Sequence, residues 1–138
     1  MLSNKDYCDY DTCVALKELG YKVPTSAYYI PNNTTLYFVS NPFRGGYVID
    51  CFYSHNSLRE DVVTSNYIDA PTMWEAQKWL REEKNIIVYP EKNCFGWYYA
   101  IHYNVGEVHQ LKFSDEYDSY EDALLEGIKE AVKILKEE

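Results

Sequence analysis

The chain has 138 residues, of which 46% are hydrophobic and 17% aromatic, and its formal charge is −9. This size and apolar content predict one domain with a core of its own and exclude a disordered chain. The sequence shows neither a bilayer-spanning run of about 20 apolar residues nor a secretion signal, so we expect a cytoplasmic protein without membrane contact.

The first predicted element is a helix near the N-terminus. Asp9 is placed to cap its first turn, and apolar residues follow at helical spacing. Gly20 ends the helix, because a glycine accepts the left-handed conformation that closes a last turn.

Short runs of strand type follow this helix. Residues 28–30 and 36–39 flank a turn-forming segment and predict a hairpin. Residues 47–53, rich in β-branched and aromatic side chains, predict a third strand. The next polar stretch is expected to be a loop with one short element near residues 67–68.

The second half begins with a capping box, in which Thr72 and Glu75 satisfy each other's backbone amides at the start of a helix. Residues 86–89 then predict a strand. Pro90, which cannot donate to a ladder, is expected to close it, with a polar turn over residues 91–93.

Two aromatic strands within residues 97–113 predict a hairpin, whose register depends on its loop. A two-residue turn at Val105 and Gly106 would place His102 opposite His109 and mix apolar with polar partners. A bulged three-residue loop separates the two kinds of side chain. We favour the bulged loop, which puts the two histidines on opposite faces.

A final helix, capped by Ser119, completes an α+β fold of antiparallel strands packed against helices. Within this single domain, residues 1–69 form an α-β-β-β subunit and residues 70–138 an α-β-β-β-α subunit. The second order is similar to that of double-stranded RNA-binding domains. Their basic surface is missing here, because residues 119–123 are acidic where those domains carry lysines.

The sequence contains no phosphate loop, no metalloprotease or hydrolase motif and no EF-hand, so we predict no enzyme activity and no cofactor. His102 and His109 would form half a metal site only in the rejected register, and the acidic residues 115–122 lack the spacing of calcium ligands. No metal site is therefore predicted. Four cysteines without C-x-x-C spacing are expected to be buried, reduced thiols: Cys8, Cys13, Cys51 and Cys94.

Aromatic side chains are the remaining functional signal, since rigid rings bind partners at low entropic cost. The chain has 15 tyrosines, and some of them must lie at the surface even if most pack in the core. The candidate interaction surface combines aromatic, histidine and acidic side chains of the second half: Trp74, Tyr98, His102, Asp115, Glu116 and Asp118.

Four segments occur in order through most of the chain: ALKELGY, PTMWEAQKWLRE, GWY and YDSYEDAL. In this combination the chain resembles small uncharacterised proteins of Bacteroidales phages and mobile elements. The matching residues are caps and core positions, so the resemblance carries over no catalytic residue. It implies a phage or prophage context, in which short acidic proteins bind host or viral proteins.

These observations favour a non-enzymatic protein-interaction or host-modulating module with a host or phage protein as partner. The alternative is binding of single-stranded or structured nucleic acid through the aromatic strands, on which bases stack. The charge disfavours nucleic acid, because residues 70–138 carry 8 basic and 14 acidic side chains. An exposed edge strand would also permit a homodimer.

Overall fold

A computed structural model describes residues 4–23, 25–38 and 67–137. Within these ranges the chain has three α-helices and two three-stranded antiparallel sheets, which confirms the predicted α+β class. It forms two compact units, Met1–Pro71 and Thr72–Glu138. The strand predicted over residues 47–53 lies outside the described residues. In the described ranges, no helix is long and apolar enough to span a bilayer.

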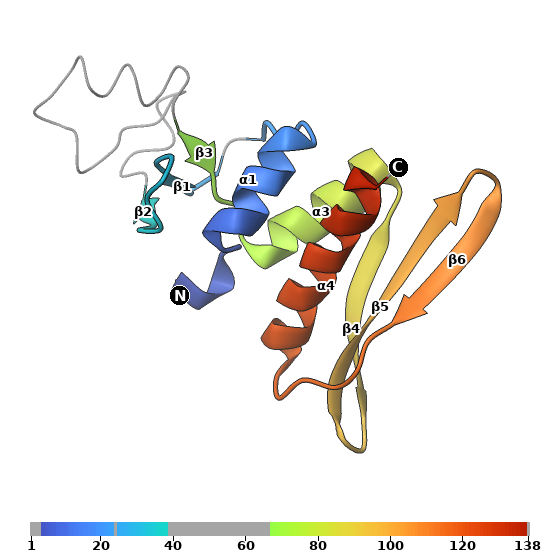
Figure 1. Cartoon of the computed structure of the whole chain (residues 1–138). Helices are drawn as coiled ribbons and strands as arrows, with labels where there is room; N and C mark the ends of the chain where they lie inside the picture. The colour runs from blue at the N-terminus through green and yellow to red at the C-terminus, as the bar shows by residue number, and fades with distance from the viewer. Residues whose placement is uncertain (1–3, 24, 39–66, 138) are drawn as a thin grey trace, which may run out of the picture. The chain divides into compact units, whose positions relative to one another are not determined.

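The first unit contains the 3-10 helix η1 (Asn4–Asp6), α1 (Tyr10–Glu18) and the strands β1 (Ala27–Tyr29), β2 (Tyr37–Phe38) and β3 (Ile68–Asp69), in the sheet order β2-β1-β3 (Figure 1). Asp9 Oδ1 accepts a hydrogen bond from the Thr12 amide at 3.0 Å. Gly20 follows the helix with a φ of +101°, and the Tyr21 amide donates to the Leu16 carbonyl at 2.9 Å. Both predicted helix ends and the predicted hairpin are confirmed.

Tyrosines supply much of the core of this unit. Tyr28 is fully buried and stacks on Tyr37, with 5.4 Å between ring centroids. The Tyr29 hydroxyl donates to the Cys8 carbonyl at 3.0 Å, and burial, followed by the nearby Cys13 thiol, raises the pKa of Tyr29. Both rings are structural, because Tyr28 is buried against other rings and the Tyr29 hydroxyl has its partner inside the unit.

The second unit contains α3 (Met73–Lys84), β4 (Ile87–Asn93), β5 (Gly96–Val105), β6 (Val108–Phe113) and α4 (Tyr120–Lys136), with the sheet order β4-β5-β6. Helices α3 and α4 lie side by side on one face of this sheet (Figure 1). Their apolar stripes fill the core between the two layers, and Leu80, Leu124 and Ile128 are fully buried there. The α-β-β-β-α order is as predicted.

The start of α3 has the predicted capping box. Thr72 Oγ1 accepts from the Glu75 amide at 3.2 Å, and Glu75 Oε1 accepts from the Thr72 amide at 2.8 Å. We expect Thr72→Ala to lower the free energy of unfolding by about 1 kcal/mol, because the first turn loses a hydrogen-bond acceptor. Thr72→Ser keeps the hydroxyl and should stay close to the parent. Urea unfolding followed by circular dichroism measures both; equal losses would assign the effect to the threonine methyl group instead.

Strand β4 continues past Pro90, contrary to the prediction. It pairs with β5 along its whole length, and the turn falls on Cys94 and Phe95. The Val88 carbonyl accepts a hydrogen bond from the Gln77 side chain at 2.8 Å. The backbone amide and carbonyl of Val88 therefore point away from β5. Pro90, two residues further, has the same orientation, so its missing amide removes no bond from the ladder.

The β5–β6 hairpin has neither register considered from the sequence. Val105 pairs with Val108, so the turn consists of Gly106 and Glu107. Gly106 has a φ of +63°, whereas Glu107 is not among the described non-glycine residues with positive φ. Glycine at the first central position is typical of a type II′ turn, whose twist matches that of the strands. The favoured three-residue bulge is therefore wrong.

Candidate functional site

Helices α3 and α4 cover one face of the β4-β5-β6 sheet very closely. A methyl group added to Gly127 of α4 would lie 2.6 Å from Val88 Cγ2 and 3.0 Å from Tyr99 Cβ. Lys112, on the same face, donates to Glu130 of α4 at 2.7 Å. Burial, with Glu130 as the next cause, raises the pKa of Tyr99 to about 12, so the phenol is uncharged at neutral pH.

The opposite face of this sheet carries the alternate side chains of each strand. We call it the open face. Its aromatic, histidine and large apolar side chains are Ile87, Tyr89, Tyr98, His102, His109, Leu111 and Phe113, and Glu91 and Ala100 belong to the same face. Both described helices of this unit pack on the other face. Phe113 is 57% exposed, Leu111 47% and Ile87 41%. A cluster of exposed apolar side chains of this kind marks a binding surface more often than scattered ones do.

Aromatic rings lie in contact across the open face. Tyr98 meets Phe113 edge to face, with 5.9 Å between ring centroids, and its hydroxyl donates to Glu91 Oε2 at 3.1 Å. Ala100 pairs with Tyr89 on one side and with Phe113 on the other, and it is fully buried although it belongs to this face. The rings therefore form a layer whose arrangement is set before any partner binds.

A chain of polar contacts joins Tyr89, His102 and His109 on the open face. The Tyr89 hydroxyl lies 3.1 Å from His102 Nε2, and His102 Nδ1 lies 3.2 Å from His109 Nε2. His109 pairs with Asn104, so it is the diagonal neighbour of His102. The expectation that the hairpin separates the two histidines is wrong, because the observed turn shifts β6 relative to both registers considered.

The two edges of the sheet differ in their protection. Pro90 and the Gln77 side chain close the β4 edge, as described above. On β6, the Ser114 amide donates to the Tyr99 carbonyl at 3.1 Å. Because backbone groups alternate along an antiparallel ladder, three residues direct their amides and carbonyls away from β5: His109, Leu111 and Phe113. No described strand pairs with this edge.

Glu91 is the one charged side chain that the described strands direct to the open face. Lys92 and Lys112 point to the helix-covered face, where Lys92 lies over the Trp97 ring at 5.7 Å. Among the described strand residues, the open face therefore offers no lysine or arginine to a phosphate group.

Two of the six residues predicted as an interaction surface, Tyr98 and His102, lie on the open face. Trp74 is 37% exposed, but it belongs to α3, which packs on the other face. Of the aromatic, histidine and large apolar side chains of the open face, five were not predicted as site residues: Ile87, Tyr89, His109, Leu111 and Phe113. The alternation of side chains along β4 and β6 would have identified them, given the correct register.

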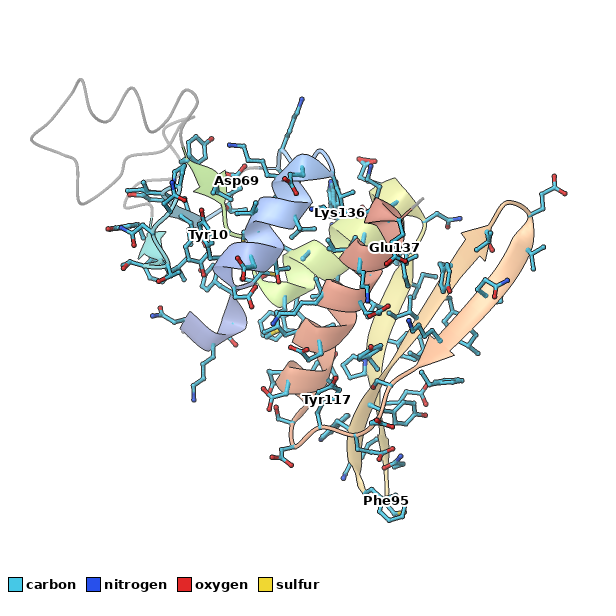
Figure 2. All side chains as sticks on the ribbon, in the orientation of Figure 1. Tyr10, Asp69, Phe95, Tyr117, Lys136 and Glu137 are labelled. Carbon is cyan, nitrogen blue, oxygen red and sulfur yellow. The ribbon has the colours of Figure 1, made fainter. Side chains whose placement is uncertain are left out.

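The three acidic residues of the predicted surface, Asp115, Glu116 and Asp118, are exposed in the connection between β6 and α4, around Tyr117 (Figure 2). Glu116 Oε2 accepts from Asn93 Nδ2 at 3.0 Å and so ties this connection to the end of β4. In the described part of the chain, no three His, Cys, Asp or Glu side chains gather as a metal-binding group.

The cysteines divide into two environments. Cys8 and Cys13 are buried, as predicted, and burial raises the pKa of Cys13. Cys94 is exposed at the β4–β5 turn, which corrects the expectation of burial for this residue. Cys51 lies outside the described residues.

The open face with the β6 edge is the candidate functional site, and its assignment rests on exposure, register and unpaired backbone groups. Comparisons of the chain with protein-family models, with curated proteins and with solved structures found no match.

Proposed function

We propose that this chain is a non-enzymatic protein-interaction module that binds an extended apolar segment of a partner protein along β6 and over the open face. The observation that carries the proposal is that Leu111 and Phe113 combine exposed apolar side chains with backbone groups directed away from β5. A segment that adds to β6 gains backbone hydrogen bonds, and the open face selects its side chains.

The protection of the sheet supports this choice of edge. Folded proteins commonly block edge strands with proline, charged side chains or covering segments. Such a block is present on β4, where Pro90 and Gln77 occupy the edge. On β6, the one charged side chain is Lys112, and it is held by Glu130 on the helix-covered face. The β6 edge is therefore available to a partner strand.

Charge indicates the chemistry of the partner. The chain carries a formal charge of −9, and Glu91 is the charged group on the open face. A segment with alternating apolar residues flanked by lysine or arginine would match this surface, and opposite charge speeds association. A second copy of the chain carries the same negative charge and is disfavoured as the occupant. The resemblance to phage and mobile-element proteins favours a host or phage protein as its source.

A peptide-display selection on the folded chain tests the proposal. We expect enriched peptides to alternate apolar and polar residues and to carry basic residues at their ends. Phe113→Ala should weaken binding of a selected peptide at least about tenfold, as loss of a central apolar contact commonly does. Leu111→Pro should weaken it similarly, because it removes an outward amide without breaking the β5–β6 ladder.

Trp74→Ala is the matched control, since it removes an exposed aromatic side chain outside the open face and should leave binding unchanged. Circular dichroism verifies that each variant is folded. If Leu111→Pro does not fold, Phe113→Ala still tests the proposal. Failure to select any peptide, or binding that survives both β6 variants, would contradict the proposal. A dimer in sedimentation experiments that Leu111→Pro abolishes would identify a second copy as the occupant instead.

Nucleic acid is the second candidate, because rings such as Tyr98 and Phe113 on an uncovered sheet face are where single-strand binders stack bases. Among the described strand residues, no lysine or arginine points to the open face, and this argues against it. We expect labelled single-stranded DNA and RNA not to bind at about 0.15 M salt. Salt-dependent binding that decreases in Tyr98→Ala would favour this candidate over a protein partner.

A further inference from the structure

We propose that His102 and His109 together bind a divalent late transition-metal ion, such as Cu²⁺, Ni²⁺ or Zn²⁺, on the open face. The site uses the imidazole rings of these residues and not the outward backbone groups of β6, so the inference does not rest on the proposed function.

The first argument is the separation of the two donor atoms. Two imidazole nitrogens bound to one ion at about 2.05 Å are about 2.9 Å apart at a right angle and about 3.3 Å apart at a tetrahedral angle. His102 Nδ1 and His109 Nε2 are 3.2 Å apart, and the ring centroids are 5.2 Å apart. The nitrogens are therefore already at the spacing of two neighbouring ligands, and a rotation of each ring away from their mutual hydrogen bond directs both lone pairs at one ion.

The second argument is the rigidity of the backbone that carries the two rings. His102 belongs to the central strand β5, and His109 belongs to β6 opposite Asn104. The ladder continues on both sides of this position, from the pair formed by Val105 and Val108 to the pair formed by Ala100 and Phe113. A pair of ligands on two hydrogen-bonded strands loses little backbone freedom when it binds an ion.

The third argument is the Tyr89 hydroxyl, which lies 3.1 Å from the second nitrogen of His102. A metal-binding histidine usually donates its other N–H to a nearby acceptor, which fixes the tautomer and the ring orientation. When His102 Nε2–H donates to Tyr89, Nδ1 has a free lone pair toward His109. His109 becomes a ligand by moving its proton from Nε2 to Nδ1, so no net proton is lost.

The donor set indicates the class of ion. Imidazole suits copper, nickel and zinc, whereas calcium and magnesium prefer oxygen ligands. In the described ranges no third His, Cys, Asp or Glu completes a cluster here. Water or a bound partner would fill the remaining positions, so we expect binding that follows the order of intrinsic affinity, with Cu²⁺ tighter than Ni²⁺ or Zn²⁺.

Calorimetric titration of the full chain with Ni²⁺ or Zn²⁺ tests the site. The titrated protein carries Cys51→Ser and Cys94→Ser, because free thiols would compete for the ion; Cys94 is exposed. We expect one ion per chain. His102→Asn and His109→Asn should each weaken binding at least about tenfold, because each removes one of two protein ligands. The ring signals of both histidines should shift together in NMR spectra of the parent.

Three further measurements sharpen the result. His55→Asn removes the other histidine of the chain and should leave the affinity unchanged. Tyr89→Phe keeps both ligands but removes the orienting hydroxyl, and it should weaken binding about tenfold. Leu111→Pro, which tests the proposed function, should not alter metal binding. No binding by the parent, or an affinity that neither His102→Asn nor His109→Asn reduces, would overturn the site; full affinity in Tyr89→Phe would overturn the part assigned to Tyr89.

Discussion

Ile101→Ala is expected to lower the free energy of unfolding by about 2–5 kcal/mol, as truncation of a fully buried isoleucine does. Ile101 lies in the central strand β5 with no exposed surface, and its neighbours Val88 and Lys112 face the helices with it. Leu111→Ala, on the open face, should change the free energy by no more than about 0.5 kcal/mol. The contrast follows from the burial of one face and the exposure of the other.

Urea unfolding monitored by circular dichroism measures both variants. Ile101→Val is the matched control for shape and should cost about 0.5–1.5 kcal/mol, because it removes one methylene group. A loss from Leu111→Ala as large as that from Ile101→Ala would mean that Leu111 contributes to the folded core. The open face would then not be free for a partner, and the proposed function would lose its main support.

Gly127→Leu is expected to prevent the normal docking of α4 on the sheet. We expect it to lower the free energy of unfolding by about 3 kcal/mol or more, because overpacking of a core commonly costs about 1–3 kcal/mol. Even a single added carbon at Gly127 would approach Val88 Cγ2 to 2.6 Å and Tyr99 Cβ to 3.0 Å. Gly127→Ala should therefore be destabilising too, although alanine favours a helix over glycine by about 1 kcal/mol.

Thermal and urea unfolding of both Gly127 variants test this expectation. Lys133→Leu adds the same side chain at an exposed position of α4 and should have little effect. Adding Val88→Ala to Gly127→Ala removes the closer of the two contacts. The double variant should therefore lose less free energy of unfolding than the sum of the losses of the two single variants. A stabilised Gly127→Ala would show that helix propensity outweighs the close contact, and the sheet–helix spacing would have to be larger.

Helix ends were predictable from the sequence because each depends on a few neighbouring residues. Asp9 caps α1, Thr72 and Glu75 form the box of α3, and Ser119 Oγ accepts from the Asp122 amide in α4 at 3.0 Å. In each case the side chain and the amide that it binds are three residues apart, so tertiary contacts have little influence. The helical boundaries of the described residues followed from this local chemistry.

The register of the β5–β6 hairpin could not be derived in the same way. The criterion used was the separation of apolar from polar side chains, and it assumes that one face is polar. Here both faces carry rings: Trp97 and Tyr99 on the covered face, Tyr98 and Phe113 on the open one. A sheet with two aromatic faces does not reveal its register through hydrophobicity, and the wrong register hid the histidine pair.

The continuation of β4 through Pro90 was also beyond local reasoning. A proline stops a strand where its amide is needed for the ladder, and it is harmless where that amide would face outward. Which of the two applies depends on the pairing with β5, a contact between segments that the local sequence of β4 does not encode. Five residues of the open face were missed for the same reason, since they come from β4 and β6 and reach this face only through their pairing with β5.

The difference between the two edges of the sheet limits how far these molecules can associate. A protein with two open edges can add copies without end and form fibres, because each new subunit presents the edge that the next one needs. Here Pro90 and Gln77 block the β4 edge. Pairing through β6 therefore occupies the one unblocked edge of the described sheet. We therefore expect assembly by strand addition on this sheet to terminate at two chains, or at one chain and one partner segment.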